Sequence, residues 1–205
     1  MAAFQAKIYE LFRSAAAGKS PFWIGAGVAG AAFAVAVLSI VLPRGGDREA
    51  SLGAWDRVAS VLQHRRCLNC HQSNEPLQGD NPRRHTPRVV RGHDNQGAPG
   101  MRCSSCHGEQ RNNEASRVPG AAHWKFAPRS MSWAGLSAGA LCRTIKDPAK
   151  NGGRSPRALV KHVEDDSLIH WAWAPGGERK PIPIPHYVFV EFVDEWVRTG
   201  AHCPD

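Results

Sequence analysis

The chain has 205 residues, six cysteines and a formal net charge of +8 at pH 7. This length predicts one domain or at most two, and a hydrophobic content of 42% excludes a polytopic membrane protein. A basic chain can bind nucleic acid, an anionic membrane or an acidic partner. Because no run of five basic residues occurs, we expect no nucleic-acid partner.

The N-terminal part of the chain predicts a membrane anchor. Residues 22–42 carry no charge over 21 consecutive positions, and about 20 apolar residues span a bilayer as a helix. We expect a cytoplasmic tail over residues 1–20 and an uncleaved transmembrane helix over residues 21–43. A cleaved signal peptide is the alternative, since Ala34-Val35-Ala36 resembles a cleavage site, but the apolar run continues to Leu42.

Residues 44–205 predict a small, mainly α domain with a loop-rich middle. Apolar residues recur every three to four positions after residue 50 and predict an amphipathic helix that runs into Cys67. Further helices are expected over residues 136–146, with Ser132 or Ser137 as the cap, and after Ser155, which precedes a proline. A last helix is expected from about residue 186 to residue 199, where Gly200 follows.

The middle of this domain lacks apolar side chains. Across residues 67–131 proline, glycine, asparagine and arginine dominate, and the large apolar residues are few: Leu68, Leu77, Val89, Val90, Met101, Val118, Trp124, Phe126 and Met131. Composition alone predicts disorder here, because too little apolar surface is available for burial. A folded segment of this composition needs another source of core.

Two motifs of the form Cys-x-x-Cys-His lie in this segment and predict that source. The pattern is typical of c-type haem attachment, because two thiols at this spacing form thioethers to one porphyrin and the next histidine binds its iron. We therefore expect two haem c groups. Attachment would use Cys67, Cys70, Cys103 and Cys106, with His71 and His107 as proximal iron ligands.

The cysteines allow two other interpretations. Two Cys-x-x-Cys pairs can hold one zinc ion, but 32 residues separate the pairs, more than the usual gap of about 15–20 residues. A zinc site also gives no reason for a histidine after each second cysteine. A thioredoxin-like motif would need a strand and a helix around it, which these polar loops do not predict.

The second axial ligands are predicted from the residues near the motifs. His85 precedes Thr86-Pro87, a rigid turn that could direct it at an iron, and Met131 lies on a polar loop where methionine has little packing role. We expect His85 at one haem and Met131 at the other, with His93 and His123 as alternatives. A methionine ligand would give that haem a higher reduction potential.

The remaining cysteines, Cys142 and Cys203, predict a disulfide, with two buried thiols as the alternative. Such a bond would close a loop of about 60 residues and stabilise the fold by roughly 4 kcal/mol in the chain-entropy model. An oxidising compartment favours the disulfide.

The chain resembles small dihaem cytochromes that are often labelled as a subunit of isoquinoline 1-oxidoreductase and are encoded near molybdenum hydroxylases. Besides the two haem motifs, the resemblance rests on several stretches: Arg91-Gly92, residues 97–100, 127–133, 146–154, 171–175 and 200–204. It implies a molybdenum hydroxylase as redox partner. It also implies that the haems are attached on the outer side of a bacterial inner membrane.

These observations predict an electron-carrier subunit and not an enzyme by itself. Similar numbers of basic residues flank the anchor on both sides, so the haem motifs decide the orientation. We expect a single-pass inner-membrane protein whose periplasmic domain links a dehydrogenase or a molybdenum hydroxylase to the respiratory chain. A haem peroxidase, which needs an open iron position, and a haem-based sensor are the alternatives.

Overall fold

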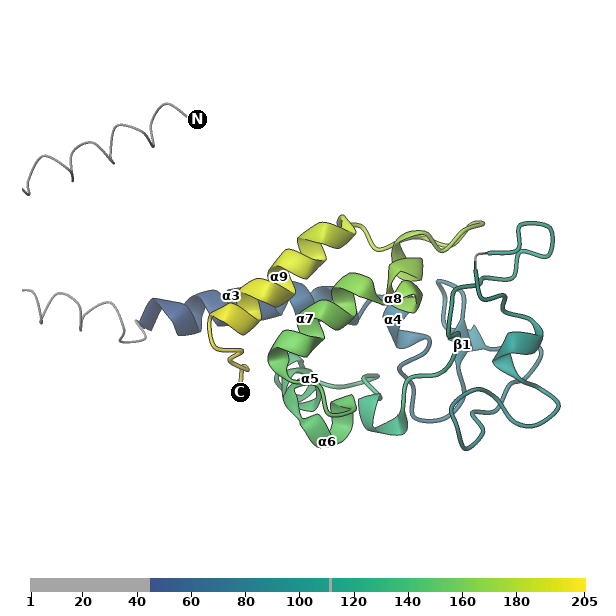
Figure 1. Cartoon of the computed structure of the whole chain (residues 1–205), viewed down its shortest axis with the longest axis horizontal. Coiled ribbons are helices and arrows are strands. Elements are labelled where there is room, and N and C mark those ends of the chain that lie inside the picture. Colours follow the sequence, from purple (N-terminus) through teal and green to yellow (C-terminus); the bar gives the residue numbers. More distant parts are fainter. Residues whose placement is uncertain (1–44, 111) are drawn as a thin grey trace, which may run out of the picture. The chain divides into compact units, whose positions relative to one another are not determined.

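The computed structural model of the protein describes residues 45–110 and 112–205 (Figure 1), which are mainly helical, as predicted. The α-helices are α3 (Gly45–Leu62), α4 (Arg65–Leu68), α5 (Ala138–Lys146), α6 (Pro148–Asn151), α7 (Pro156–Asp165), α8 (Ser167–His170) and α9 (His186–Arg198). Short 3-10 helices are η2 (Cys103–Ser105), η3 (Arg129–Met131) and η4 (Trp171–Trp173). Strands β1 (Leu77–Gln78) and β2 (Arg83–Arg84) pair antiparallel.

The predicted cytoplasmic tail and transmembrane anchor, residues 1–20 and 21–43, lie outside the described residues. Among the helices from residue 45 onward, none is long and apolar enough to cross a membrane. The anchor therefore stays a prediction from the sequence.

The main core lies between four helices. Helix α3 packs along α9 and against α5, and α7 packs on α9 (Figure 1). Trp55 of α3 and Trp196 of α9 are at most 1% exposed, and their ring centroids lie 4.9 Å apart. Each indole N–H still has an acceptor, because Trp55 donates to the Ala138 carbonyl and Trp196 to the His202 carbonyl. Both tryptophans thus fill the core without leaving a buried donor unpaired.

Local signals set most helix ends where the sequence places them. Ser137, one of the two predicted caps, accepts a hydrogen bond from the Ala140 N–H, and Ser155 accepts one from Ala158. The first helix is the exception, since it ends at Leu62 and does not run into Cys67. The His64 side chain accepts the Arg66 N–H and so begins the separate helix α4, on which Cys67 lies.

The predicted disulfide between Cys142 and Cys203 is present, with the two Cα atoms 5.5 Å apart. It ties the C-terminal residues to α5. These residues pass directly over Gly139, where a Cβ atom would lie 2.5 Å from the Pro204 carbonyl oxygen. Only glycine therefore allows this close approach.

The segment between α4 and η3 is mostly irregular and has a small core of its own. This core consists of Val89, Cys103 and Phe126, with Trp124 packed against it. Arg91 is 4% exposed and adds polar contacts, donating to the Asn95 side chain and to the carbonyls of Gln72 and Ala127. One buried guanidinium thus joins three loops where apolar contacts are scarce.

Candidate functional site

The two Cys-x-x-Cys-His motifs have the same local backbone structure. In the first, the N–H groups of Cys70 and His71 donate to the Cys67 carbonyl at 3.2 and 3.1 Å. In the second, the N–H groups of Cys106 and His107 donate to the Cys103 carbonyl at 3.2 and 2.9 Å. Each motif is therefore a single helical turn that holds two thiols and one imidazole close together.

Both motif histidines are oriented through their Nδ1 atoms. His71 Nδ1 lies 2.7 Å from the Met131 carbonyl oxygen, and His107 Nδ1 lies 2.7 Å from that of Pro119. Because a carbonyl only accepts, each Nδ1 carries the proton and each Nε2 keeps a free lone pair. Metal-binding histidines commonly have this arrangement, with the ring fixed by a hydrogen bond to its other nitrogen.

A tryptophan supports each of these imidazole rings. The ring centroid of His71 lies 3.3 Å from that of Trp133, with an interplanar angle of 14°. The ring of His107 stacks on Trp124 at 4.3 Å and 7°. Neither tryptophan was singled out from the sequence, because each follows its histidine by a different number of residues and only the fold brings them together.

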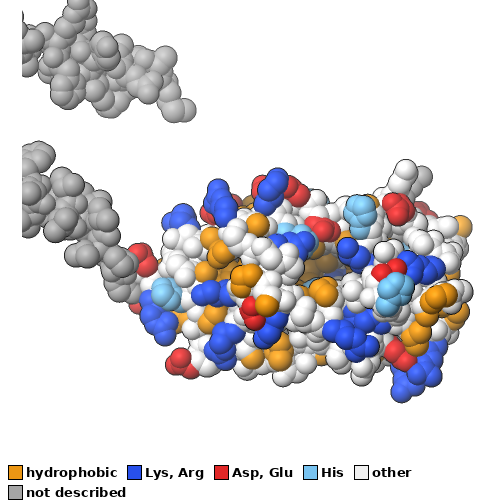
Figure 2. Space-filling view, turned by 60° about the horizontal axis from the view of Figure 1, so that its bottom comes forward, with side chains coloured by type: hydrophobic (Ala, Val, Ile, Leu, Met, Phe, Trp, Pro, Cys, Tyr) orange, Lys and Arg blue, Asp and Glu red, His pale blue; other side chains and the backbone are white. Residues whose placement is uncertain are grey.

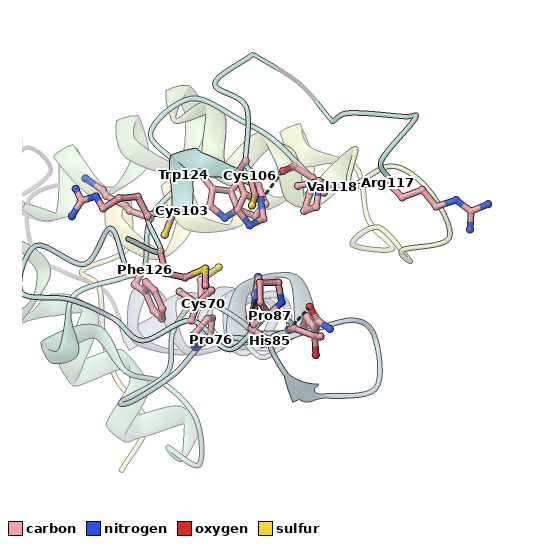
Figure 3. Close-up of a pocket in the computed structure, with 18 of the residues that line it drawn as sticks. Cys70, Pro76, His85, Pro87, Cys103, Cys106, Arg117, Val118, Trp124 and Phe126 are labelled. Atoms are coloured by element: carbon pink, nitrogen blue, oxygen red, sulfur yellow. Dashed lines mark hydrogen bonds between the residues drawn. The ribbon is translucent and has the colours of Figure 1, made fainter. Parts of the chain in front are cut away.

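At the second motif the structure forms a cavity of about 270 Å³ (Figure 3). Its walls carry Cys70, Cys103 and Cys106 together with His85 and His107. Apolar side chains, including Val89, Val118 and Phe126, line part of the walls, and the basic side chains of Arg102, Arg117, Lys125 and Arg179 line another part. In Figure 3, Cys103, Cys106 and Trp124 lie on one side of the cavity, and Cys70, Pro76, Pro87 and His85 lie on the other.

His85 stands opposite His107 in this cavity. The ring centroids are 6.0 Å apart with an interplanar angle of 63°. His85 Nδ1 lies 2.8 Å from the Pro87 carbonyl oxygen, so Nδ1 is the donor of this contact and Nε2 is the ring nitrogen left to bind a metal. The structure therefore brings together one histidine from a motif and one predicted second ligand, each with a free Nε2.

The first motif is packed against the helical core, where Cys67 and Leu68 contact the main cluster. Burial raises the pKa of the Cys67 thiol to about 12. It also raises that of Cys70 to about 11, helped by the nearby charge of Cys103. Burial lowers the pKa of His71 to about 4. At neutral pH His71 is thus an uncharged imidazole, which is the form that binds metals.

The other predicted ligands lie elsewhere. Met131 contacts His71 through its carbonyl oxygen at Nδ1, while its side chain packs against the helical core. The contact that the structure shows is therefore not through the methionine sulfur, and the assignment of Met131 as a ligand stays a prediction. His93 and His123 are exposed.

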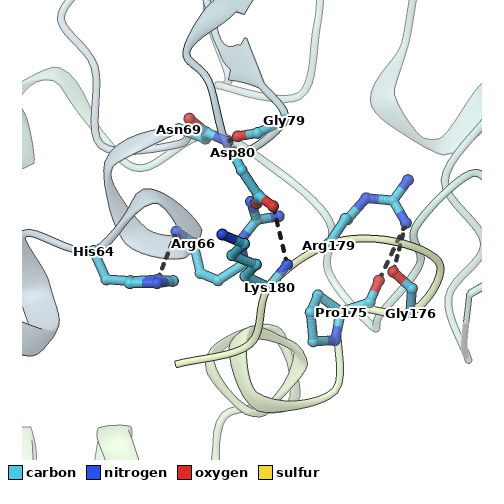
Figure 4. Close-up of polar contacts among 9 residues, drawn as sticks. All are labelled: His64, Arg66, Asn69, Gly79, Asp80, Pro175, Gly176, Arg179 and Lys180. Carbon is cyan, nitrogen blue, oxygen red and sulfur yellow. Dashed lines mark hydrogen bonds and ion pairs between the residues drawn. The ribbon is translucent and has the colours of Figure 1, made fainter. Parts of the chain in front are cut away.

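A second cavity of about 560 Å³ shares His85 and His107 with the first and reaches a basic cluster (Figure 4). There Arg66, 4% exposed, forms an ion pair with Asp80. The Lys180 N–H donates to the other Asp80 oxygen at 3.2 Å. Arg179 donates to the carbonyls of Pro175 and Gly176. Sequence reasoning missed this cluster, because its members are about 100 residues apart.

Four buried side-chain atoms have no hydrogen-bond partner among the described residues: Arg66 Nε, Asn69 Oδ1, Arg91 Nε and Trp133 Nε1. All four surround the motifs. Arg66 and Asn69 line the second cavity, Trp133 stacks on His71, and Arg91 bonds to the carbonyl next to His71. Because unpaired buried polar groups are costly, these atoms fit a polar group bound at the motifs. The three donors among them, Arg66 Nε, Arg91 Nε and Trp133 Nε1, together with the free thiols and imidazoles, fit a haem with its carboxylates, whereas the Asn69 oxygen is an acceptor and does not add to this fit.

The zinc alternative finds no support in the described part of the chain. No three Cys, His, Asp or Glu side chains there lie close enough together to hold a metal ion. A haem does not need such a cluster, because the protein supplies only the axial ligands.

Comparisons with protein-family models, with curated proteins and with solved structures found no match to this chain. The resemblance to dihaem cytochromes therefore rests on the residues quoted from the sequence alone.

Proposed function

We propose that the protein is an electron carrier with two covalently attached haem c groups. Cys67 and Cys70 would hold one group and Cys103 and Cys106 the other, with His71 and His107 as proximal ligands. A bound haem supplies a one-electron redox centre. The observation that carries the proposal is the cavity at the second motif, in which two free thiols lie beside two facing histidines.

We assign His85 as the second axial ligand at this motif. The rings of His85 and His107 face each other across the cavity with their centroids 6.0 Å apart, so the two side chains could together hold one iron. An iron with two histidine ligands has no open position, which favours electron transfer over the peroxidase alternative.

The expected partners follow from the predicted anchor and the resemblance. The domain would lie in the periplasm, held at the inner membrane by residues 21–43. It would pass electrons from a dehydrogenase, with a molybdenum hydroxylase as the leading candidate, toward the respiratory chain. On the face shown in Figure 2, Lys and Arg side chains are spread along the domain, and charges of this kind can attract an acidic redox partner.

The test is the haem content of the protein produced with the c-type maturation machinery. Pyridine haemochrome spectra should give two haems per chain for the wild type. The double variant Cys103→Ala/Cys106→Ala should give one. A protein that carries no haem, or that carries zinc instead, would contradict the proposal.

The ligand assignment has a separate test. His85→Ala should open the iron at the second motif, so the reduced variant should bind one more carbon monoxide per chain than the wild type. His93→Ala is the matched control, because it removes an exposed histidine from the same segment, and it should leave carbon monoxide binding unchanged. Equal binding by His85→Ala and the wild type would exclude His85 as the ligand.

A further inference from the structure

The second cavity joins the space between His85 and His107 to a basic wall. Among the described residues that line it, four arginines face two carboxylates: Arg66, Arg83, Arg117 and Arg179 against Asp80 and Glu178. The wall therefore has a surplus of two positive charges. A cavity with such a surplus is suited to a ligand that carries two negative charges.

Arg66 is the most deeply placed of these arginines. Its guanidinium pairs with Asp80 and lies over the Trp171 ring, with 5.7 Å from Cζ to the ring centroid. The Nε atom is buried and has no acceptor among the described residues. Leaving a charged donor buried and unpaired is unfavourable, so a residue that lines the cavity holds a donor without an acceptor (Figure 4 shows the Arg66 side chain beside Asp80).

Arg179 lies close enough to interact with Arg66. Burial lowers the pKa of Arg179, and the positive charge of Arg66 lowers it further. The carboxylate that offsets this repulsion belongs to Asp80, which is already bonded to Arg66 and to the Lys180 N–H. The Asp80 carboxylate therefore does not neutralise both guanidinium groups, and both side chains line the second cavity.

The Cys103 and Cys106 thiols line only the first cavity, together with apolar residues such as Phe126. Arg66 and Asp80 line only the second cavity, and Arg179 lines both. A haem has the same polarity, because the edge that forms thioethers is opposite to the edge that carries its two carboxylates.

We propose that Arg66 and Arg179 bind the two carboxylates of the haem attached at Cys103 and Cys106. The inference rests on the proposed function. It adds that the basic wall fixes which way this haem faces and raises its reduction potential, since positive charge beside the iron favours the reduced state. Arg66 also lies next to Cys67, and its charge acts on the Cys67 and Cys70 thiols, whereas the charge of Arg179 acts on His107 of the second motif. Arg179 is therefore the residue that distinguishes the two haems.

The experiment is a redox titration of the two-haem protein and its variants, followed by visible absorption. Arg179→Gln should shift one of the two midpoint potentials to a lower value, and Arg66→Gln should lower the same potential and also act on the other, because Arg66 lies next to Cys67. Both variants should retain both haems. Arg66→Lys keeps the charge and should give a smaller shift, which covers the case in which Arg66→Gln does not fold. Arg88→Gln is the control, because it removes an exposed arginine that is paired with Glu75 and lines neither cavity.

A crystal structure of the haem-loaded protein gives the direct readout. The carboxylate oxygens should lie within hydrogen-bond distance of both guanidiniums. Carboxylates that point to solvent, or variants that hold two haems at unchanged potentials, would overturn the inference and leave the proposed function intact. A protein without haem would overturn both.

Discussion

The helical part of the domain and the loop segment between α4 and η3 are stabilised in different ways. Helices α3, α5, α7 and α9 bury a continuous apolar core around Trp55 and Trp196. The apolar cluster of the loop segment is small, consisting of Val89, Cys103 and Phe126, and the segment also depends on polar contacts such as those of Arg91. The segment that contains the cavity at the second motif thus has too few apolar side chains for a full core of its own. Under the proposed function, we expect the haems to complete this core.

We expect the largest difference between the two regions when the proposed haem attachment is prevented. In the variant with all four motif cysteines replaced by alanine, amides of residues 72–128 should exchange with solvent at nearly unprotected rates. Helices α3 and α9 should keep their protection, because their core contains no motif residue among its buried members. Hydrogen exchange with mass spectrometry measures both regions in one sample. Equal loss in both regions would contradict the division.

A core substitution in the helical part should lower the free energy of unfolding by the same amount whether or not haem is bound. Trp196→Ala removes a side chain that is 1% exposed and packs on Trp55, and truncating a buried aromatic residue costs about 3–5 kcal/mol. Urea unfolding should show this loss in proteins with and without haem. Tyr187→Ala on the same helix is the control, because Tyr187 is 65% exposed and should change stability by no more than about 0.5 kcal/mol.

Removing the disulfide should lower the free energy of unfolding by a comparable amount, because the bond ties the C-terminal residues to α5 in the helical part. Replacing Cys142 and Cys203 with alanine opens a loop of 61 residues, which costs about 4 kcal/mol in the chain-entropy model. Urea unfolding of the double variant measures the loss. Adding a thiol reductant should bring the wild type to the stability of the variant and should leave the variant unchanged, whereas a wild type insensitive to reductant would contradict this account.

The smallest expected effect lies in the loop segment. Arg102 bonds to Asp94 and holds the pKa of that carboxyl at about 2, below its ordinary value, and the Gln96 N–H adds to the shift. Because the folded-state pKa is depressed, the stabilisation is complete above about pH 4 and is lost as the pH falls toward 2. Asp94→Asn should flatten thermal stability across this range and lower it slightly at neutral pH, since the pair is solvent-exposed. An unchanged acid profile in the variant would show that the pair contributes nothing.

Much of the helical part could be predicted from the sequence because its signals are local. Ser137 and Ser155 cap their helices through N–H groups three residues away. The break after Leu62 was missed, because it depends on one hydrogen bond from Arg66 to the His64 side chain, and the apolar period continues across it.

The two Cys-x-x-Cys-His motifs could likewise be found by spacing alone, but most of their surroundings could not. The turn at Thr86-Pro87 favours His85 as a ligand, but it does not indicate which motif His85 faces, because His85 and His107 are 22 positions apart in the chain. The ion pair of Arg66 with Asp80, and the contact of Asp80 with Lys180, depend on how distant loops return to α4.

The mainly α class of the described domain, the helix caps and the two motifs can be predicted from the sequence, because each depends on residues within one or two turns of each other. The histidine that faces His107, the contact of His71 with the Met131 carbonyl and the position of the basic wall become visible only in the folded domain. These features arise from contacts between segments far apart in the chain, and such contacts are set by packing and hydrogen bonding of the whole domain.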